Sequence, residues 1–170
     1  GDISTRGVRQ AADLDECSRL GRVVADQIRP GSSSADGPIL TASSFVTLTP
    51  GHLPAHREST LDPASRQAET LQQARRLRRP ATALEGATVR AARLGGLRLI
   101  GLPGEPFLDL RSRADGVLLL GYVGGYVGYL PTREAFAGEP TYETVISVVA
   151  PGEPERLVNI GTELLSRLNT

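Results

Sequence analysis

The Gly95-Gly96 dipeptide constrains the fold of this chain more than any other feature. It separates two runs of strand-forming residues, at about 87–94 and 97–102. A two-residue glycine loop is typical of a tight β-hairpin, because the loop positions need a backbone conformation that glycine adopts without strain. We therefore expect the two runs to be neighbouring antiparallel strands.

The segments around this hairpin predict both helices and strands. Apolar residues spaced three and four apart mark the helices, whereas runs of β-branched and aromatic residues mark the strands. The expected helices cover residues 11–29, 62–79 and 154 onward, and the expected strands cover 39–49 and 116–123. The last strand is almost wholly apolar, which is typical of a strand buried on both faces. The predicted class is α/β, with a mixed β-sheet flanked by helices.

Composition narrows the possible partners. The chain has 19 basic and 19 acidic residues, so it lacks the positive surplus with which proteins bind nucleic acid or acidic membranes. No apolar run approaches the roughly 20 residues of a transmembrane helix. We expect a soluble protein, either cytoplasmic or secreted, and the sequence does not distinguish these compartments.

The cysteine and methionine content of the chain leads to two further expectations. Cys17 is the one cysteine, so an internal disulfide is excluded, and its place on the apolar stripe of the first helix predicts a buried thiol. Methionine is absent. Its absence predicts a processed chain, a trimmed one or a piece of a longer polypeptide.

Ser4 and Glu105 are the first candidates for chemistry. Ser4 follows a Gly-Asp turn and could be a nucleophile or a positioning hydroxyl, although a serine in this position is more often a cap. Glu105 comes directly after a strand and a Pro-Gly pair, where side chains of α/β sheets often reach ligands. It could bind a metal or act as a base, or it could simply compensate the dipole of a following helix.

Aromatic and imidazole side chains supply the other candidates. Tyr129 and Tyr142 stand among glycine and acidic neighbours. They could belong to a site, or they could pack in the core with satisfied hydroxyls. His52 and His56 have a spacing that suits a metal on a helix, but Pro54 between them breaks such a helix and disfavours that role.

Five short motifs follow one another in a characteristic order. They are Gly-Asp-Ile-Ser at the start, Gly-Leu-Pro-Gly-Glu after a strand, Gly-Tyr-Leu-Pro-Thr, Tyr-Glu, and Ala-Pro-Gly-Glu before the last helix. This order resembles the neutral/alkaline non-lysosomal ceramidase family, over nearly the whole chain. The resemblance implies that residues 1–170 form the C-terminal half of a catalytic domain that hydrolyses the amide bond of N-acylsphingosine with the help of Zn²⁺.

The resemblance also implies a role for each candidate residue. Ser4 matches the family's essential serine, Glu105 a zinc-ligating glutamate, and Tyr129 a tyrosine that sits on the metal. Tyr142 matches a second active-site tyrosine, which hydrogen-bonds near the reacting carbonyl. The family's zinc-binding histidines belong to its N-terminal half, and His52 and His56 stand in the wrong place to replace them.

A partner is therefore expected. Two oxygen ligands should hold zinc poorly, since imidazoles normally supply much of the affinity. We expect an N-terminal half or a second subunit to supply the histidines, and the fold to be incomplete without it. The expected substrate is a ceramide-like N-acyl lipid, or a smaller amide or ester. The alternative is a non-catalytic subunit or binding module that retained the fold.

Overall fold

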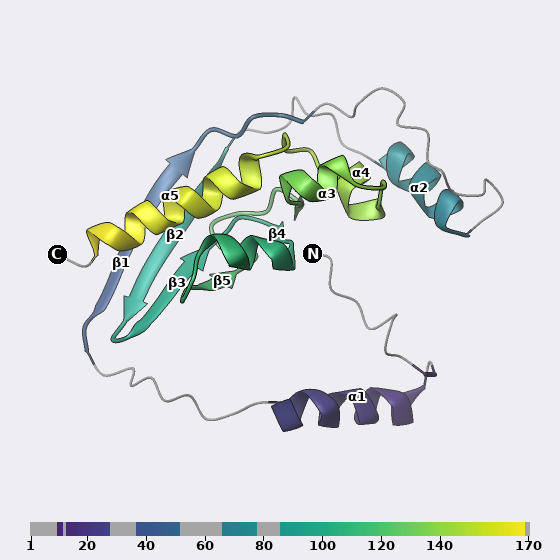
Figure 1. The fold of residues 1–170 in the computed structure, drawn as a ribbon, viewed down its shortest axis with the longest axis horizontal. Helices are drawn as coiled ribbons and strands as arrows, with labels where there is room; N and C mark the ends of the chain where they lie inside the picture. The colour runs from purple at the N-terminus through teal and green to yellow at the C-terminus, as the bar shows by residue number, and fades with distance from the viewer. Residues whose placement is uncertain (1–9, 12, 28–36, 52–65, 78–85, 169–170) are drawn as a thin grey trace.

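The structure, a computed structural model, describes residues 10–11, 13–27, 37–51, 66–77 and 86–168 (Figure 1). Its elements in chain order are α1 (Leu14–Gln27), β1 (Ile39–Val46), α2 (Arg66–Leu77), β2 (Ala87–Leu94), β3 (Leu97–Gly101), β4 (Glu105–Pro106), the 3-10 helix η3 (Leu108–Arg113), β5 (Leu118–Leu120), β6 (Tyr129–Leu130), α3 (Arg133–Ala137), α4 (Tyr142–Ile146) and α5 (Glu153–Arg167). None of the helices in these ranges is long and apolar enough to cross a membrane.

Strands β1, β2, β3 and β5 form a mixed sheet in that order. The first three strands are antiparallel, and β5 runs parallel to β3. Leu94 pairs with Leu97 across the Gly95-Gly96 turn, so the predicted hairpin is confirmed. The predicted α/β class, a mixed sheet flanked by helices, is confirmed with it.

Helix α5 lies across one face of this sheet, as Figure 1 shows in yellow, and the main core fills the space between them. Because side chains alternate along a strand, β2 and β3 present Val89 and Ile100 to the helix, where Leu157 meets them without exposure to solvent. Gly161 brings the helix close, since a Cβ there would lie 2.5 Å from Cγ2 of Ile100. This close approach lets α5 pack directly against β3.

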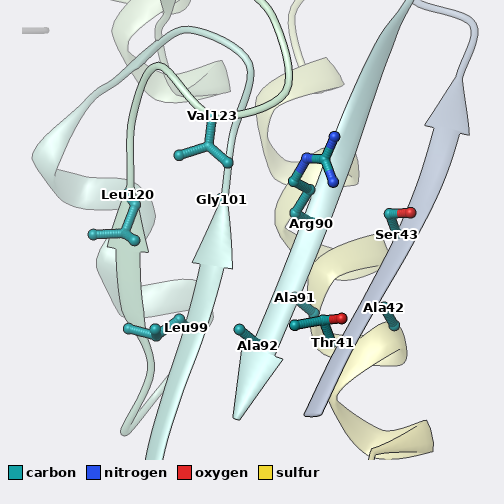
Figure 2. A pocket seen from close by; sticks show the side chains of 10 residues that line it. All are labelled: Thr41, Ala42, Ser43, Arg90, Ala91, Ala92, Leu99, Gly101, Leu120 and Val123. Carbon is teal, nitrogen blue, oxygen red and sulfur yellow. The ribbon is translucent and has the colours of Figure 1, made fainter. Parts of the chain in front are cut away.

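No described helix covers the other face of the sheet, which we call the bare face (Figure 1). Phe45 is 70% exposed and Leu118 is 52% exposed. A shallow cavity of about 410 Å³ lies on this face, between Thr41 and Arg90 on one side and Leu120 on the other (Figure 2). The prediction that the 116–123 run is buried on both faces is wrong, because β5 is a sheet edge and α5 covers one face only.

Helix α1 lies within the expected range and exposes its apolar side. Asp13 caps it, with Oδ1 accepting the backbone N–H of Glu16 at 2.8 Å. The apolar stripe is open to solvent, with Leu14 84% exposed, and Cys17 is exposed with it. The predicted burial of the Cys17 thiol is therefore wrong, since a helical pattern shows which residues share a face but not whether that face is covered.

Glu153 holds the start of α5 on the segment that follows β1. Its buried carboxylate accepts the backbone N–H of Thr49 at 3.1 Å and a guanidinium N–H of Arg156 at 2.6 Å. Burial opposes ionisation of this carboxyl, but these hydrogen bonds outweigh it and lower the pKa of Glu153 below its ordinary value. An ionised glutamate therefore holds the helix on the sheet.

Candidate functional site

The chain leaves β3 through a turn that delivers Glu105 beyond the end of the strand. Residues 102–104 form this turn, and Gly104 lies so close to the backbone of Gly128 that a Cβ would collide with its carbonyl oxygen. Only glycine allows this approach. The Pro-Gly pair ahead of Glu105 thus has a packing reason, and it places a carboxylate at the carboxyl end of a central strand.

A glycine-rich segment, residues 121–128, wraps around this turn. Backbone hydrogen bonds tie the two together: Leu102 N to Leu120 O at 2.8 Å, Val123 N to Leu102 O at 2.9 Å, Tyr122 N to Gly104 O at 2.9 Å, Val127 N to Pro103 O at 2.7 Å, and Glu105 N to Gly128 O at 2.9 Å. Because these hydrogen bonds join backbone groups, the position of Glu105 relative to this segment does not depend on side-chain packing.

Glu105 and Tyr129, both singled out from the sequence, are direct neighbours. They are paired residues of the parallel strands β4 and β6, which in a sheet lie about 4.8 Å apart. Paired residues project to the same side of a sheet. Both side chains are half-buried, so a ligand can reach them.

All four tyrosines of the chain gather around this pair. Tyr126 donates its hydroxyl to Oε1 of Glu105 at 2.7 Å. Its ring stacks on Tyr122, with centroids 5.5 Å apart and planes 1° from parallel. Tyr129 meets Tyr142 edge to face, with centroids 6.1 Å apart and planes at 82°. The sequence, which contains 4 Tyr and no Trp, thus concentrates its tyrosines in one place.

Local capping sets the position of Tyr142. Thr141 caps α4, accepting the backbone N–H of Thr144 at 3.3 Å, while the Thr144 hydroxyl accepts the backbone N–H of Thr141 at 2.9 Å. This reciprocal capping box fixes the first turn of the helix. Ser147 then donates its hydroxyl to the Tyr129 carbonyl at 3.0 Å, which anchors the end of α4 on β6.

Sequence reasoning missed Tyr122 and Tyr126. The sequence does carry a signal for them, because Gly-Tyr-Val-Gly occurs twice in succession over residues 121–128. Such a repeat indicates that two equivalent side chains share one turn. Tyr122 also has a φ of 60° and is the one described non-glycine residue with a positive φ, a conformation that costs a residue of this kind of the order of 1 kcal/mol.

Carboxylates give this corner a negative potential. Burial, followed by Glu105 and Glu143, raises the pKa of Tyr129 above its ordinary value. The hydrogen bond to Glu105, followed by burial, raises the pKa of Tyr126. Both phenols are therefore protonated at neutral pH and act as hydrogen-bond donors.

The described donors fit part of a zinc shell. Glu105 and Tyr129 offer a carboxylate and a phenol side by side, and a divalent cation beside that phenol would oppose the carboxylates and favour its ionised form. Within the part of the chain that the structure describes, no group of three or more His, Cys, Asp or Glu could hold a metal ion. A complete shell needs donors beyond these residues.

The remaining sequence candidates lie outside the described residues. These are Ser4, His52 and His56. Of the predicted site residues, the structure therefore brings together Glu105, Tyr129 and, through its ring contact, Tyr142.

Comparison with known proteins shows similarity of fold to solved structures, but no match in sequence. No protein-family profile and no curated protein sequence matches the chain. The chain is similar to the solved structure of neutral ceramidase from Pseudomonas aeruginosa, with a TM-score of 0.48, 15% identity, and coverage of 78% of this chain and 28% of that one. It is also similar to a structure described as "Ceramidase complexed with C2", with a TM-score of 0.50, 16% identity, and coverage of 78% and 30%.

These matches confirm the predicted ceramidase resemblance at the level of fold. The chain spans less than a third of the ceramidase chains it matches. Its mixed sheet and helices thus correspond to one part of a larger fold.

Proposed function

We propose that this chain is a subunit or processed fragment of a zinc-dependent amidohydrolase, which cleaves the N-acyl amide bond of a ceramide-like lipid or a related ester. The observation that carries the proposal is the pairing of Glu105 with Tyr129 across β4 and β6, on a fold that resembles part of a ceramidase. A shared cation requires these two side chains to be neighbours, and they are the two residues to which the sequence resemblance assigns metal contacts.

Glu105 and Tyr129 are the residues that would hold zinc. Metal-ligating carboxylates are typically hydrogen-bonded by a second residue, and Tyr126 makes such a bond to Glu105. The N-terminal half of the domain or a second subunit would supply imidazole ligands, because oxygen donors alone bind zinc weakly. That partner would also complete the fold.

When bound, zinc would polarise the amide carbonyl and lower the pKa of a coordinated water to about 7. Tyr142 would donate its hydroxyl to the carbonyl oxygen as negative charge develops there. One donor of this kind typically accelerates a reaction about 100- to 1,000-fold. Ser4 would serve as nucleophile or as the hydroxyl that orients the attacking water, a role that rests on the sequence resemblance alone.

A metal and subunit census of the native protein tests the proposal. The protein is purified from its source without chelators, its zinc is measured, and co-purifying chains are sequenced. We expect zinc together with a polypeptide that carries a His-x-His motif. Active protein without zinc would refute the proposal.

Variants of the purified complex sharpen this test. Glu105→Gln should lower zinc affinity by more than about 100-fold, since loss of a ligand exceeds the 10- to 100-fold effect of its supporting residues. Glu134→Gln is the matched control, because Glu134 is an exposed glutamate paired with Arg113 at 2.9 Å. Unchanged zinc content in the Glu105→Gln complex would contradict the assignment of this residue.

A non-catalytic subunit is the second candidate. One observation favours it: the described residues by themselves offer too few side chains for a metal site. This candidate predicts that the complex forms without zinc. It also predicts that every substrate hydrolysed by the partner is hydrolysed by the complex as well.

A further inference from the structure

We propose that Tyr122 and Tyr126 form a binding surface for the apolar acyl group of a neutral amide or ester substrate, beside Glu105. This tyrosine platform rests on the proposed function, because it assigns the acyl side of that substrate to a place in the structure. It adds two residues that the sequence resemblance did not assign to the site.

The exposure of the two rings is the first argument. Tyr122 is 66% exposed and Tyr126 is 61% exposed, although their rings stack in parallel. Exposed aromatic surface gains little from folding, and paired exposed rings are typical of surfaces that bind something. The two stacked rings thus keep much of their apolar surface open to solvent, next to the Glu105 carboxylate that accepts the Tyr126 hydroxyl.

The rigidity of the platform is the second argument. Backbone hydrogen bonds from Tyr122 and Val123 hold the segment on the 102–104 turn, and Gly124 lies against the carbonyl of Thr88 with no room for a Cβ. Tyr122 keeps its left-handed backbone in this setting. A non-glycine residue held in such a conformation at the surface indicates function, and a fixed surface binds with less loss of conformational entropy.

The hydrogen bond to Glu105 leaves the ring faces free for an apolar ligand. Tyr126 donates its hydroxyl to the Glu105 carboxylate at 2.7 Å, so the polar end of this side chain already has a partner. An uncharged hydrocarbon chain gains apolar contact with the ring faces and needs no charged partner there.

Calorimetric titration of the native complex offers a direct test. The probes are hexanamide and acetamide, which share the amide and differ in chain length. We expect hexanamide to bind in a saturable way, and acetamide to give no saturable binding over the same range of concentration. Equal responses to the two amides would overturn the proposal.

Tyr122→Gly is the informative variant, since glycine adopts the positive φ without strain and removes the ring. We expect its affinity for hexanamide to fall about 10-fold, with no loss of cooperative unfolding. Phe45→Ala is the matched control, because it removes another exposed ring, on the bare face of the sheet, and should leave affinity unchanged. Affinity within twofold of the parent in Tyr122→Gly would overturn the platform.

Different outcomes would refute the tyrosine platform and the proposed function. Saturable binding of hexanamide without amide hydrolysis by the native complex supports the platform and counts against the hydrolase. If the complex hydrolyses amides, the KM of hexanoyl substrates should rise in Tyr122→Gly while that of acetyl substrates stays constant. Parallel changes for both chain lengths would refute the platform and leave the hydrolase standing.

Discussion

The layer formed by α5 and the sheet, and the segment that carries the tyrosines, are held in place by different interactions. In the α5 layer, fully buried side chains such as Ile100 and Leu157 interlock. In the tyrosine segment, backbone hydrogen bonds and glycine contacts fix the chain, while the side chains stay partly exposed. This difference indicates that the buried side chains of the α5 layer supply most of the stability, whereas backbone contacts of the tyrosine segment set the geometry of the site.

The largest effect should come from the α5 layer. Leu157→Ala removes a fully buried side chain and should lower the free energy of unfolding by about 3 kcal/mol, through lost burial and the cavity left behind. Urea denaturation measures this value. Leu118→Ala, on the bare face, is the control and should cost well under half as much; equal losses would mean that the bare face is covered in solution.

The next effect should come from the tyrosine segment. Gly104→Ala forces the turn away from the carbonyl of Gly128 and should cost about 2 kcal/mol. It should also change the tyrosine emission, because the turn sets the position of Glu105 relative to Tyr126. Gly138→Ala meets only ordinary contacts and serves as control. An unaltered spectrum in Gly104→Ala would show that the site does not depend on this backbone contact.

The pH dependence of the α5 layer should be smaller. The pKa of Glu153 is lowered in the folded state, so its contribution is present above the ordinary value of 4.5 and is lost as the pH falls through the lowered pKa. Glu153→Gln should cost about 1–2 kcal/mol at neutral pH and flatten the acid limb of the stability curve. If the stability of Glu153→Gln fell with decreasing pH as steeply as that of the parent, the pH dependence would be due to other groups.

The smallest effect on stability should come from the hydroxyl of Tyr126. Tyr126→Phe keeps the stacked ring and removes the bond to Glu105, so unfolding should become easier by less than about 1 kcal/mol. The carboxyl carbon signal of Glu105 in an NMR spectrum should nevertheless shift. A stability loss as large as that of Leu157→Ala would abolish the distinction between the two regions.

Local signals in the sequence were sufficient for the elements whose cause is local. Gly95-Gly96 predicted the β2–β3 hairpin, and the apolar face beyond Pro154 predicted α5. Whether a face is covered depends on tertiary packing, which no local pattern contains. For this reason the burial of the β5 run and of Cys17 was wrongly predicted.

Single residues of the site could be predicted from the motifs, but the contacts between them could not. The resemblance pointed to Glu105, Tyr129 and Tyr142, but their proximity follows from the parallel pairing of β4 with β6 and from the capping of α4. Tyr122 and Tyr126 were missed because their importance comes from a stacked pair and a hydrogen bond across the turn.

The bare sheet face has a practical consequence for anyone who produces this chain. Strands β1 and β5 are the edges of this sheet, and no described strand pairs with their outer sides; apolar side chains such as Phe45 and Leu118 lie exposed on the adjoining surface. Such edges recruit further strands, and the resulting material precipitates. If this chain is expressed alone, its recombinant yield should therefore depend on whether these edges and this face stay exposed, and inclusion bodies would be a consequence of that exposure.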